Sequence, residues 1–314
     1  MNYLKDYREG EKFVGTYLCK QKQILKTKAG KTYYSLTLQD KTGTADGKIW
    51  ELNNGIANFE PMDYIHCEGM VTSFQGNLQM NISRVRISDE GEYDPADYVP
   101  CTNKDVGEMF SRILKYVASV QNKYLRKILE MYFVENKEFV DAFKKHSAAK
   151  SVHHGFMGGL LEHPLSVTDM CQYFAEHYPM IHRDLLITAA LFHDMGKIQE
   201  ISDFPMNDYT DDGQLLGHIY IGARCMENAA AQIPNFPPKL KNELVHCILA
   251  HHGKMEFGSP KVPAIMEAMA LHMADNADAK LQTLTEVFTQ AGDNMGWLGF
   301  NRMFESNLRK TSEE

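Results

Sequence analysis

The stretch DLLITAALFHDMGKI, residues 184–198, decides how the larger part of this chain is interpreted. Residues 185–192 are apolar except for one threonine, and they predict a buried helix. His193 and Asp194 follow at its end, where an imidazole and a carboxylate must both be satisfied by hydrogen bonds or by a metal ion. The pair alone carries little information, because 13 histidines and 41 acidic residues make such dipeptides common by chance.

Further histidines and an aspartate lie in or beside other apolar helical stretches. LLEHPLSV carries His163, GHIYIGARCM carries His218, CILAHHGK carries His251 and His252, and ALHMADNADAKL carries Asp275. Taken singly, each is most simply a hydrogen-bonded core or helix-end residue. A helical bundle that gathers these side chains in one buried pocket would lose folding free energy unless cations were bound there, because the buried polar groups would lack partners. Imidazole and carboxylate without thiolate suit Mn²⁺, Fe²⁺ or Mg²⁺ better than structural zinc.

A carboxylate beside a histidine can bridge two ions. Two ions about 3.5–4 Å apart can activate a water and stabilise the leaving oxygen of a phosphoryl displacement. The pattern therefore favours metal-dependent hydrolysis of a phosphate ester.

The composition is that of a two-domain globular protein, with 314 residues, 44% of them hydrophobic and 24% charged. No apolar run approaches the ~18–20 residues of a membrane span, and the charged start MNYLKDYREGEKF is not a signal peptide. Six scattered cysteines without C-x-x-C spacing indicate reduced thiols in a cytoplasmic protein and argue against a zinc finger.

The net charge of −8 is unevenly distributed. Residues 1–88 hold 12 Lys and Arg against 9 Asp and Glu, a net of +3, whereas the remainder holds 21 against 32, a net of −11. Such asymmetry indicates separate roles. The positive charge of the first segment suits contact with the phosphate backbone of a nucleic acid, and the second segment supplies carboxylates that could bind metal ions.

Residues 1–88 predict an all-β domain. FVGTYLCKQKQIL, TYYSLTLQD, GKIWEL, DYIHCEGMVTSF and LQMNISRVRI alternate with period two and are rich in β-branched and aromatic residues. Five strands with a helical insert at 53–61 match the element order of an OB-fold, a barrel that often binds oligonucleotides; an SH3-like barrel is the alternative. An acidic linker over 89–102 and an all-α domain over 103–314 follow.

The first hairpin of the predicted barrel is basic. Single-strand binders combine a basic groove with aromatic faces on which bases stack. The hairpin offers these candidates for nucleic-acid contact: Lys20, Lys22, Lys26, Lys28, Lys31 and Tyr33. Tyr33 and Tyr34 point to opposite faces of a strand, so at most one meets a ligand. Trp50 and Phe74 are assigned to the core. The lysines could equally form a solvated edge that deters aggregation.

The ordered set H…HD…D resembles the signature of the HD-domain metal-dependent phosphohydrolases, and the extra histidines match their two-metal members. HHGFMGGLLEHPLSV, LFHDMGKI, LLGHI, ILAHHG and ADNADAKL behind a barrel are more closely similar to the YhaM-type bacterial 3′→5′ exoribonucleases. This resemblance covers essentially the whole chain. It implies a multidomain fold in which an N-terminal OB-fold barrel precedes an all-α HD-domain helical bundle.

The resemblance also implies roles for individual residues. The first metal set comprises His163, His193, Asp194 and Asp275; His218 and His251 complete the second, and Asp194 bridges the ions. Whether His252 is a ligand stays open, and Pro164 directly after His163 departs from the expected pattern.

Three residues near this set are candidates for contact with substrate. Lys197 would contact a substrate phosphate, although a helix-end lysine favoured by the helix dipole is the simpler interpretation. Arg224 is a further phosphate candidate, and His154 is a candidate for the rim of the pocket.

The leading hypothesis is a cytoplasmic 3′→5′ exoribonuclease with two divalent ions, most simply Mn²⁺. It would hydrolyse single-stranded RNA, with single-stranded DNA as a further candidate substrate, to nucleoside 5′-monophosphates; direction and products are implied by the resemblance. One alternative is an HD phosphohydrolase acting on nucleotides or cyclic dinucleotides. Another is a non-catalytic single-strand-binding protein. GWLGFNRMF, with Trp297, Phe300 and Phe304, is either core or a contact within a homo-oligomer.

Overall fold

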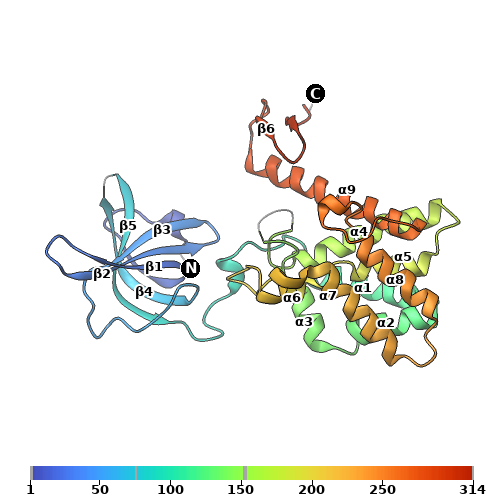
Figure 1. The fold of residues 1–314 in the computed structure, drawn as a ribbon. Coiled ribbons are helices and arrows are strands. Elements are labelled where there is room, and N and C mark those ends of the chain that lie inside the picture. Colours follow the sequence, from blue (N-terminus) through green and yellow to red (C-terminus); the bar gives the residue numbers. More distant parts are fainter. Residues whose placement is uncertain (1–2, 75, 151–153, 313–314) are drawn as a thin grey trace. The chain divides into compact units, whose positions relative to one another are not determined.

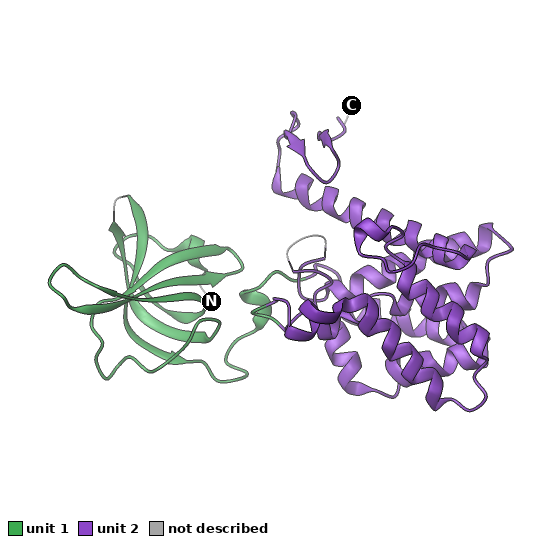
Figure 2. Ribbon diagram, in the orientation of Figure 1, with its two compact units in different colours: residues 1–101, 204–206 green, residues 102–203, 207–314 purple. Residues whose placement is uncertain are grey.

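The computed structural model describes residues 3–74, 76–150 and 154–312. The chain divides into two compact units, residues 1–101 with 204–206 and residues 102–203 with 207–314 (Figure 2). The first is an all-β barrel and the second is helical, which confirms the predicted fold class. Residues 89–101 belong to the first unit. The division at 88 and 102 into barrel, linker and helical domain stays a prediction.

The first unit is a closed five-stranded barrel (Figure 1). Its strands follow one another in the order β1-β2-β3-β5-β4, and only the β3–β5 pair is parallel. This is the arrangement of an OB-fold. The strands are β1 (Lys12–Lys26), β2 (Thr32–Asp40), β3 (Gly43–Ile49), β4 (Tyr64–Phe74) and β5 (Asn77–Ile87).

The barrel core is apolar and rich in aromatic rings, with Phe13, Tyr17 and Phe59 almost fully buried. A register shift in β4 between Glu68 and Gly69 brings β4 very close to β5. A Cβ at Gly69 would lie 2.0 Å from the carbonyl oxygen of a β5 residue, so only glycine fits there.

Two expectations for the barrel are wrong. The insert at 53–61 forms turns rather than a helix, because its backbone pairs with β5: Val85 donates to the Gly55 carbonyl and Ala57 donates to the Val85 carbonyl. Trp50 and Phe74 are not core residues, since 40% and 62% of their surface is exposed. Both lie at strand ends, where the alternation of buried and exposed faces gives way to loop.

The helical unit is built around α5 (Arg183–Phe192), and residues 185–192 are all buried as predicted. Helices α4, α8, α9 and α2 pack against it. The other elements are α1 (Val106–Ser119), α2 (Lys123–Phe133), α3 (Lys137–Lys145), α4 (Gly159–His177), α6 (Lys197–Glu200), α7 (Asp211–Gln232), α8 (Pro238–Ala250), α9 (Met266–Gln290) and the short strands β6 (Phe300–Asn301) and β7 (Ser306–Asn307). Across the described residues, no helix is both long and apolar enough to cross a membrane.

Candidate metal centre

The histidine and aspartate that follow α5 lie at the middle of a buried polar cluster. His193 is fully buried and Asp194 is 3% exposed. The Nδ1–H of His193 donates to the carbonyl of Ala190, 2.7 Å away, which directs Nε2 toward the cluster. Because α5 is buried on every side, both side chains are fixed by the helix that carries them.

One group of ligands surrounds Oδ2 of Asp194. Nε2 of His163, from α4, lies 3.5 Å from this oxygen and 3.2 Å from Oδ1 of Asp275, from α9. Nε2 of His193 lies 3.7 and 3.8 Å from the same two oxygens. Two imidazole nitrogens and two carboxylate oxygens from three separate helices therefore converge within 4 Å.

A second group faces the other oxygen of Asp194. Nε2 of His218 and Nε2 of His251 lie 3.5 and 3.7 Å from Oδ1. His252 belongs to this group as well, since ligand atoms of the three histidines lie within 4.8 Å of one another. Asp194 thus directs one oxygen to each group, as a bridging carboxylate does.

The residues present fit metal ions. Three buried atoms at this point have no hydrogen-bond partner among the described residues: Oδ1 of Asp194, Nε2 of His218 and Nε2 of His251. An unpaired buried polar atom costs roughly 1–3 kcal/mol. Nitrogen and carboxylate lone pairs that point at one another repel, whereas a cation between them satisfies all three.

The Nδ1 atom of each imidazole in the cluster makes a hydrogen bond to a carboxylate or a backbone carbonyl. The carboxylate of Asp278 accepts from Nδ1 of His163 at 2.7 Å, and that of Glu200 accepts from Nδ1 and from the backbone N–H of His218, both at 2.9 Å. Backbone carbonyls hold the other rings through Nδ1: Ala190 for His193, Ile248 for His251 and Phe257 for His252. These contacts orient each ring so that Nε2 faces the interior of the cluster, as in a metal-binding histidine.

Sequence reasoning missed Asp278 and Glu200. Asp278 follows Asp275 by one helical turn within the quoted ADNADAKL, so its spacing was the available signal. Glu200 reaches His218 because Gly217, with φ of +72°, interrupts α7. Gly196 permits this approach, since a Cβ there would lie 2.1 Å from the carbonyl oxygen of His218.

Burial and charge set the protonation of the cluster. Burial lowers the pKa of His193, His251 and His252, which keeps them neutral as ligands must be. Burial also opposes the charge of His163, but the hydrogen bonds that its ring donates to Asp275 and Asp278 outweigh this effect and raise the pKa of His163 to about 10.

The carboxylate of Asp194 has a cation beside it. Nζ of Lys197 lies 3.4 Å from Oδ2 of Asp194 and donates to the carbonyl of Ala148 at 2.6 Å. Burial would raise the pKa of Asp194, but Lys197 and the neighbouring imidazoles hold it well below its usual range. Burial likewise opposes the charge on Lys197, yet Asp194 raises the lysine pKa, so both groups are ionised.

The cluster opens into a cavity of about 360 Å³. It is lined by His163, Asp194, Lys197, His252, Phe257, His272, Asp275, Asn276 and Ala279. Two candidates from the sequence lie elsewhere. His154 is buried behind the cluster, where its Nε2 lies 2.9 Å from Oδ2 of Asp278. Arg224 is outside this lining, with its guanidinium 5.7 Å from the ring of Tyr220.

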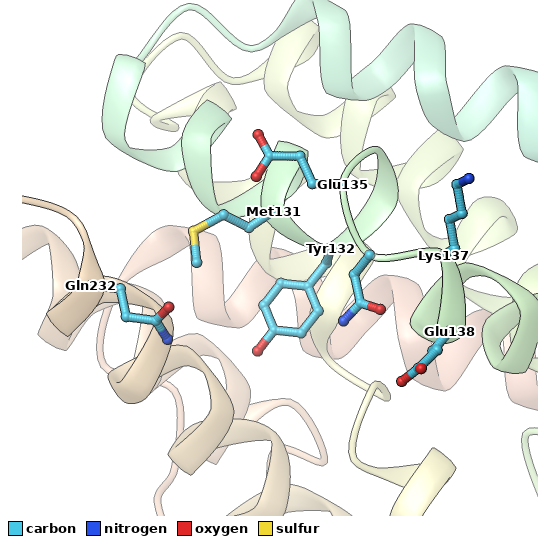
Figure 3. A pocket seen from close by; sticks show the side chains of 7 residues that line it. Met131, Tyr132, Glu135, Lys137, Glu138 and Gln232 are labelled. Carbon is cyan, nitrogen blue, oxygen red and sulfur yellow. The ribbon is translucent and has the colours of Figure 1, made fainter.

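A larger cavity of about 580 Å³ lies between the α2–α3 junction and the end of α7. Figure 3 shows Gln232 of α7 opposite Met131 and Tyr132 of α2. Its charged lining residues are Glu135, Glu138 and one lysine, so the net charge repels phosphate. It contains no member of the metal cluster and is not the candidate site.

On the barrel, four of the candidate lysines (20, 26, 28 and 31) are exposed. Lys22 is different, because its ammonium donates to the carbonyl of Phe59 at 2.5 Å and its side chain is largely covered. Tyr33 stacks on Trp50, with ring centroids 4.6 Å apart, and Trp50 donates from Nε1 to Asn81. Tyr34 instead packs on the core ring of Phe59. The partly exposed Tyr33–Trp50 pair is an aromatic surface, of which only Tyr33 is predicted from the sequence to contact nucleic acid.

Comparison with known proteins gives consistent matches. Residues 160–280 match the HD domain family. The chain is 32% identical over 257 residues to the 3′-5′ exoribonuclease YhaM of Geobacillus sp. (strain WCH70), covering 81% of this chain and 78% of that protein. The corresponding protein of Bacillus subtilis (strain 168) is 32% identical over 262 residues, with 81% of each chain covered. That of Listeria innocua serovar 6a is 32% identical over 293 residues, 90% of each chain.

Proposed function

This chain belongs to the YhaM 3′-5′ exoribonuclease family, and we propose that it is a metal-dependent exonuclease that degrades single-stranded RNA from its 3′ end to nucleoside 5′-monophosphates. The observation that carries the proposal is the carboxylate of Asp194. Its two oxygens face two groups of buried histidines, and three atoms at this point have no partner among the described residues. This arrangement suits phosphodiester hydrolysis better than passive binding.

Two divalent ions fit these residues. His163, His193 and Asp275 with one oxygen of Asp194 would hold the first. His218 and His251 with its other oxygen would hold the second, and His252 is near enough to join them. Mn²⁺ is proposed, with Fe²⁺ and Mg²⁺ as alternatives, because the donors are imidazole and carboxylate. When bound, such ions activate water and stabilise charge on the phosphodiester.

The protein's own residues orient the substrate. Lys197 stays charged in the cavity and, held by the Ala148 carbonyl, is positioned to contact the scissile phosphate. On the other unit, the Tyr33–Trp50 pair and the exposed lysines supply a stacking face and positive charge for single-stranded RNA. Single-stranded DNA offers the same bases and phosphates and is included as a second substrate.

The proposal includes a cytoplasmic location and a homo-oligomer. Six free cysteines are consistent with a reducing compartment. Trp297 and Phe300, after α9, are 69% and 66% exposed, which supports an intersubunit contact rather than a core position. Light scattering of the wild-type protein and of a Trp297→Ser/Phe300→Ser variant tests the oligomer.

The decisive experiment uses the His193→Ala/Asp194→Ala protein and a time course on single-stranded, 5′-end-labelled RNA with Mn²⁺, Mg²⁺ or chelator. We expect cleavage to fall by at least about a thousandfold while RNA affinity is unchanged. His177→Ala, which removes a histidine at the exposed end of α4, is the matched control and should cleave normally. Undiminished cleavage by the double variant would contradict the metal centre.

Two further measurements separate the alternative functions. Faster turnover of free nucleotides or cyclic dinucleotides than of an oligoribonucleotide would favour a small-molecule phosphohydrolase. Purified protein without stoichiometric Mn or Fe, and without cleavage when either metal is added, would favour a non-catalytic binding protein.

A further inference from the structure

An aromatic ring projects at the edge of the metal cavity. Phe257 lines the same cavity as His163, Asp194 and Lys197, yet 56% of its surface is exposed. The rest of that lining is mainly imidazole, carboxylate, amide and ammonium. A large apolar ring left in contact with solvent costs hydrophobic free energy that burial elsewhere would recover. Its position in the lining makes the ring available to an apolar face of a molecule bound in the cavity.

The backbone that carries this ring is rigid. Phe257 ends a 3₁₀ turn, Met255–Phe257, in which its N–H donates to the Lys254 carbonyl at 3.0 Å. Gly258, with φ of +86°, closes the turn. The hydroxyl of Ser259, only 2% exposed, donates to the Leu249 carbonyl at 3.0 Å and ties the turn to α8. The backbone of Phe257 is thus held in place by hydrogen bonds, and more than half of the ring faces solvent.

The same turn is joined to the metal cluster. The carbonyl of Phe257 accepts from Nδ1 of His252 at 2.8 Å, so one residue orients a candidate ligand and presents a ring to the cavity. Nζ of Lys254 lies 5.2 Å from the ring centroid, which adds a cation near one side of it. An apolar face, a nearby cation and a phosphate-binding lysine match the parts of one nucleotide.

We propose that Phe257 is the face on which the 3′-terminal nucleobase of the substrate stacks while the scissile phosphate lies at Asp194 and Lys197. The inference rests on the proposed exonuclease function and adds the residue that recognises the terminal nucleoside. A cavity of about 360 Å³ suits one nucleotide rather than a folded RNA. Because every base has an aromatic face, stacking here selects for a base without selecting its identity.

The test compares Phe257→Leu with wild type on two oligoribonucleotides, one natural and one whose 3′-terminal nucleotide is abasic. For the natural substrate we expect Phe257→Leu to raise KM about tenfold. The abasic substrate should be poor for wild type and no poorer for the variant. Phe257→Trp should restore the wild-type KM, since it keeps a stacking face.

Two controls separate stacking from damage to the turn. Met255, 74% exposed in the same turn, does not line the cavity, so Met255→Leu should behave as wild type on both substrates. Bound metal per chain should be equal in Phe257→Leu and wild type, because the carbonyl that holds His252 remains.

Each outcome decides the inference. If Phe257→Leu prefers the natural end over the abasic end as strongly as wild type does, the stacking role is overturned while the exonuclease function stands. If the wild-type protein cleaves neither substrate, the proposed function fails, and the inference fails with it.

Discussion

The two units of this chain differ in whether their buried polar side-chain atoms have hydrogen-bond partners. Across the described residues, all four buried side-chain atoms without a hydrogen-bond partner lie in the helical unit, on His154, Asp194, His218 and His251. The barrel has none among its described residues, and it presents Trp50 and its lysines at the surface. A surface of this kind binds and releases a ligand without changing the core.

The difference supports the proposed location of the reaction in the helical unit. Three of the unpaired atoms, on Asp194, His218 and His251, converge on one point, which is unfavourable unless a cation lies there. Stacking rings and lysines carry no such cost, but they supply only affinity. Variants of the helical unit should therefore change metal binding and turnover, and variants of the barrel should change RNA affinity alone.

The largest of the expected effects in this comparison concerns the carboxylates behind the ligands. Asp278 supports His163 and Glu200 supports His218, one for each group. Removing a partner of this kind typically lowers metal affinity 10- to 100-fold. In a calorimetric Mn²⁺ titration, Asp278→Asn should weaken one class of site by about that factor and Glu200→Gln the other.

Each variant serves as the control for the other, because both replace a carboxylate by an amide of nearly the same shape. RNA affinity, measured without divalent ions, should equal that of wild type in both. Equal weakening of both sites by either variant would contradict the separate assignment of the two carboxylates.

A second effect follows from the protonation of His163. Asp275 and Asp278 raise the pKa of His163 to about 10 against the opposing effect of burial, so the ring carries two protons at neutral pH when no ion is bound. A metal must displace the proton on Nε2. The Mn²⁺ affinity of the first site should therefore increase about tenfold for each unit by which the pH is raised, up to about pH 10. Titrations in buffers of different ionisation enthalpy should detect one released proton; release of none at pH 8 would disprove it.

The sequence identifies the candidate ligands better than the residues that surround them, for a physical reason. His163, His193 and Asp275 are conspicuous because a polar side chain within an apolar helix must be satisfied by something. Glu200 has no such signal: it is the last residue of the short helix α6, and its contact with His218 depends on the interruption at Gly217. Tertiary approach of this kind cannot be obtained from local periodicity.

The barrel gives the same lesson. Alternation along the strands predicts the five strands of the barrel, because it reflects which face is buried. It fails at Trp50, one residue past the end of β3, where the two-residue period no longer applies. The helix expected at 53–61 is absent because that segment pairs with Val85 of β5, a contact between residues distant in sequence.

The smallest expected effect tests the barrel half of the comparison. Trp50→Ala removes one ring of the Tyr33–Trp50 stack and should weaken single-stranded RNA binding on the order of five- to tenfold, the lower part of the range for loss of one stacking face. Trp50→Phe keeps the ring and loses only the hydrogen bond to Asn81, so it should bind nearly as wild type. Val14→Ala, an exposed apolar change elsewhere on the barrel, is the control.

Fluorescence anisotropy measures the affinity, and turnover at saturating RNA should be the same for all three variants. A fall in saturated turnover with unchanged affinity would mean that the barrel acts on the reaction itself, and the division between binding and chemistry would no longer hold.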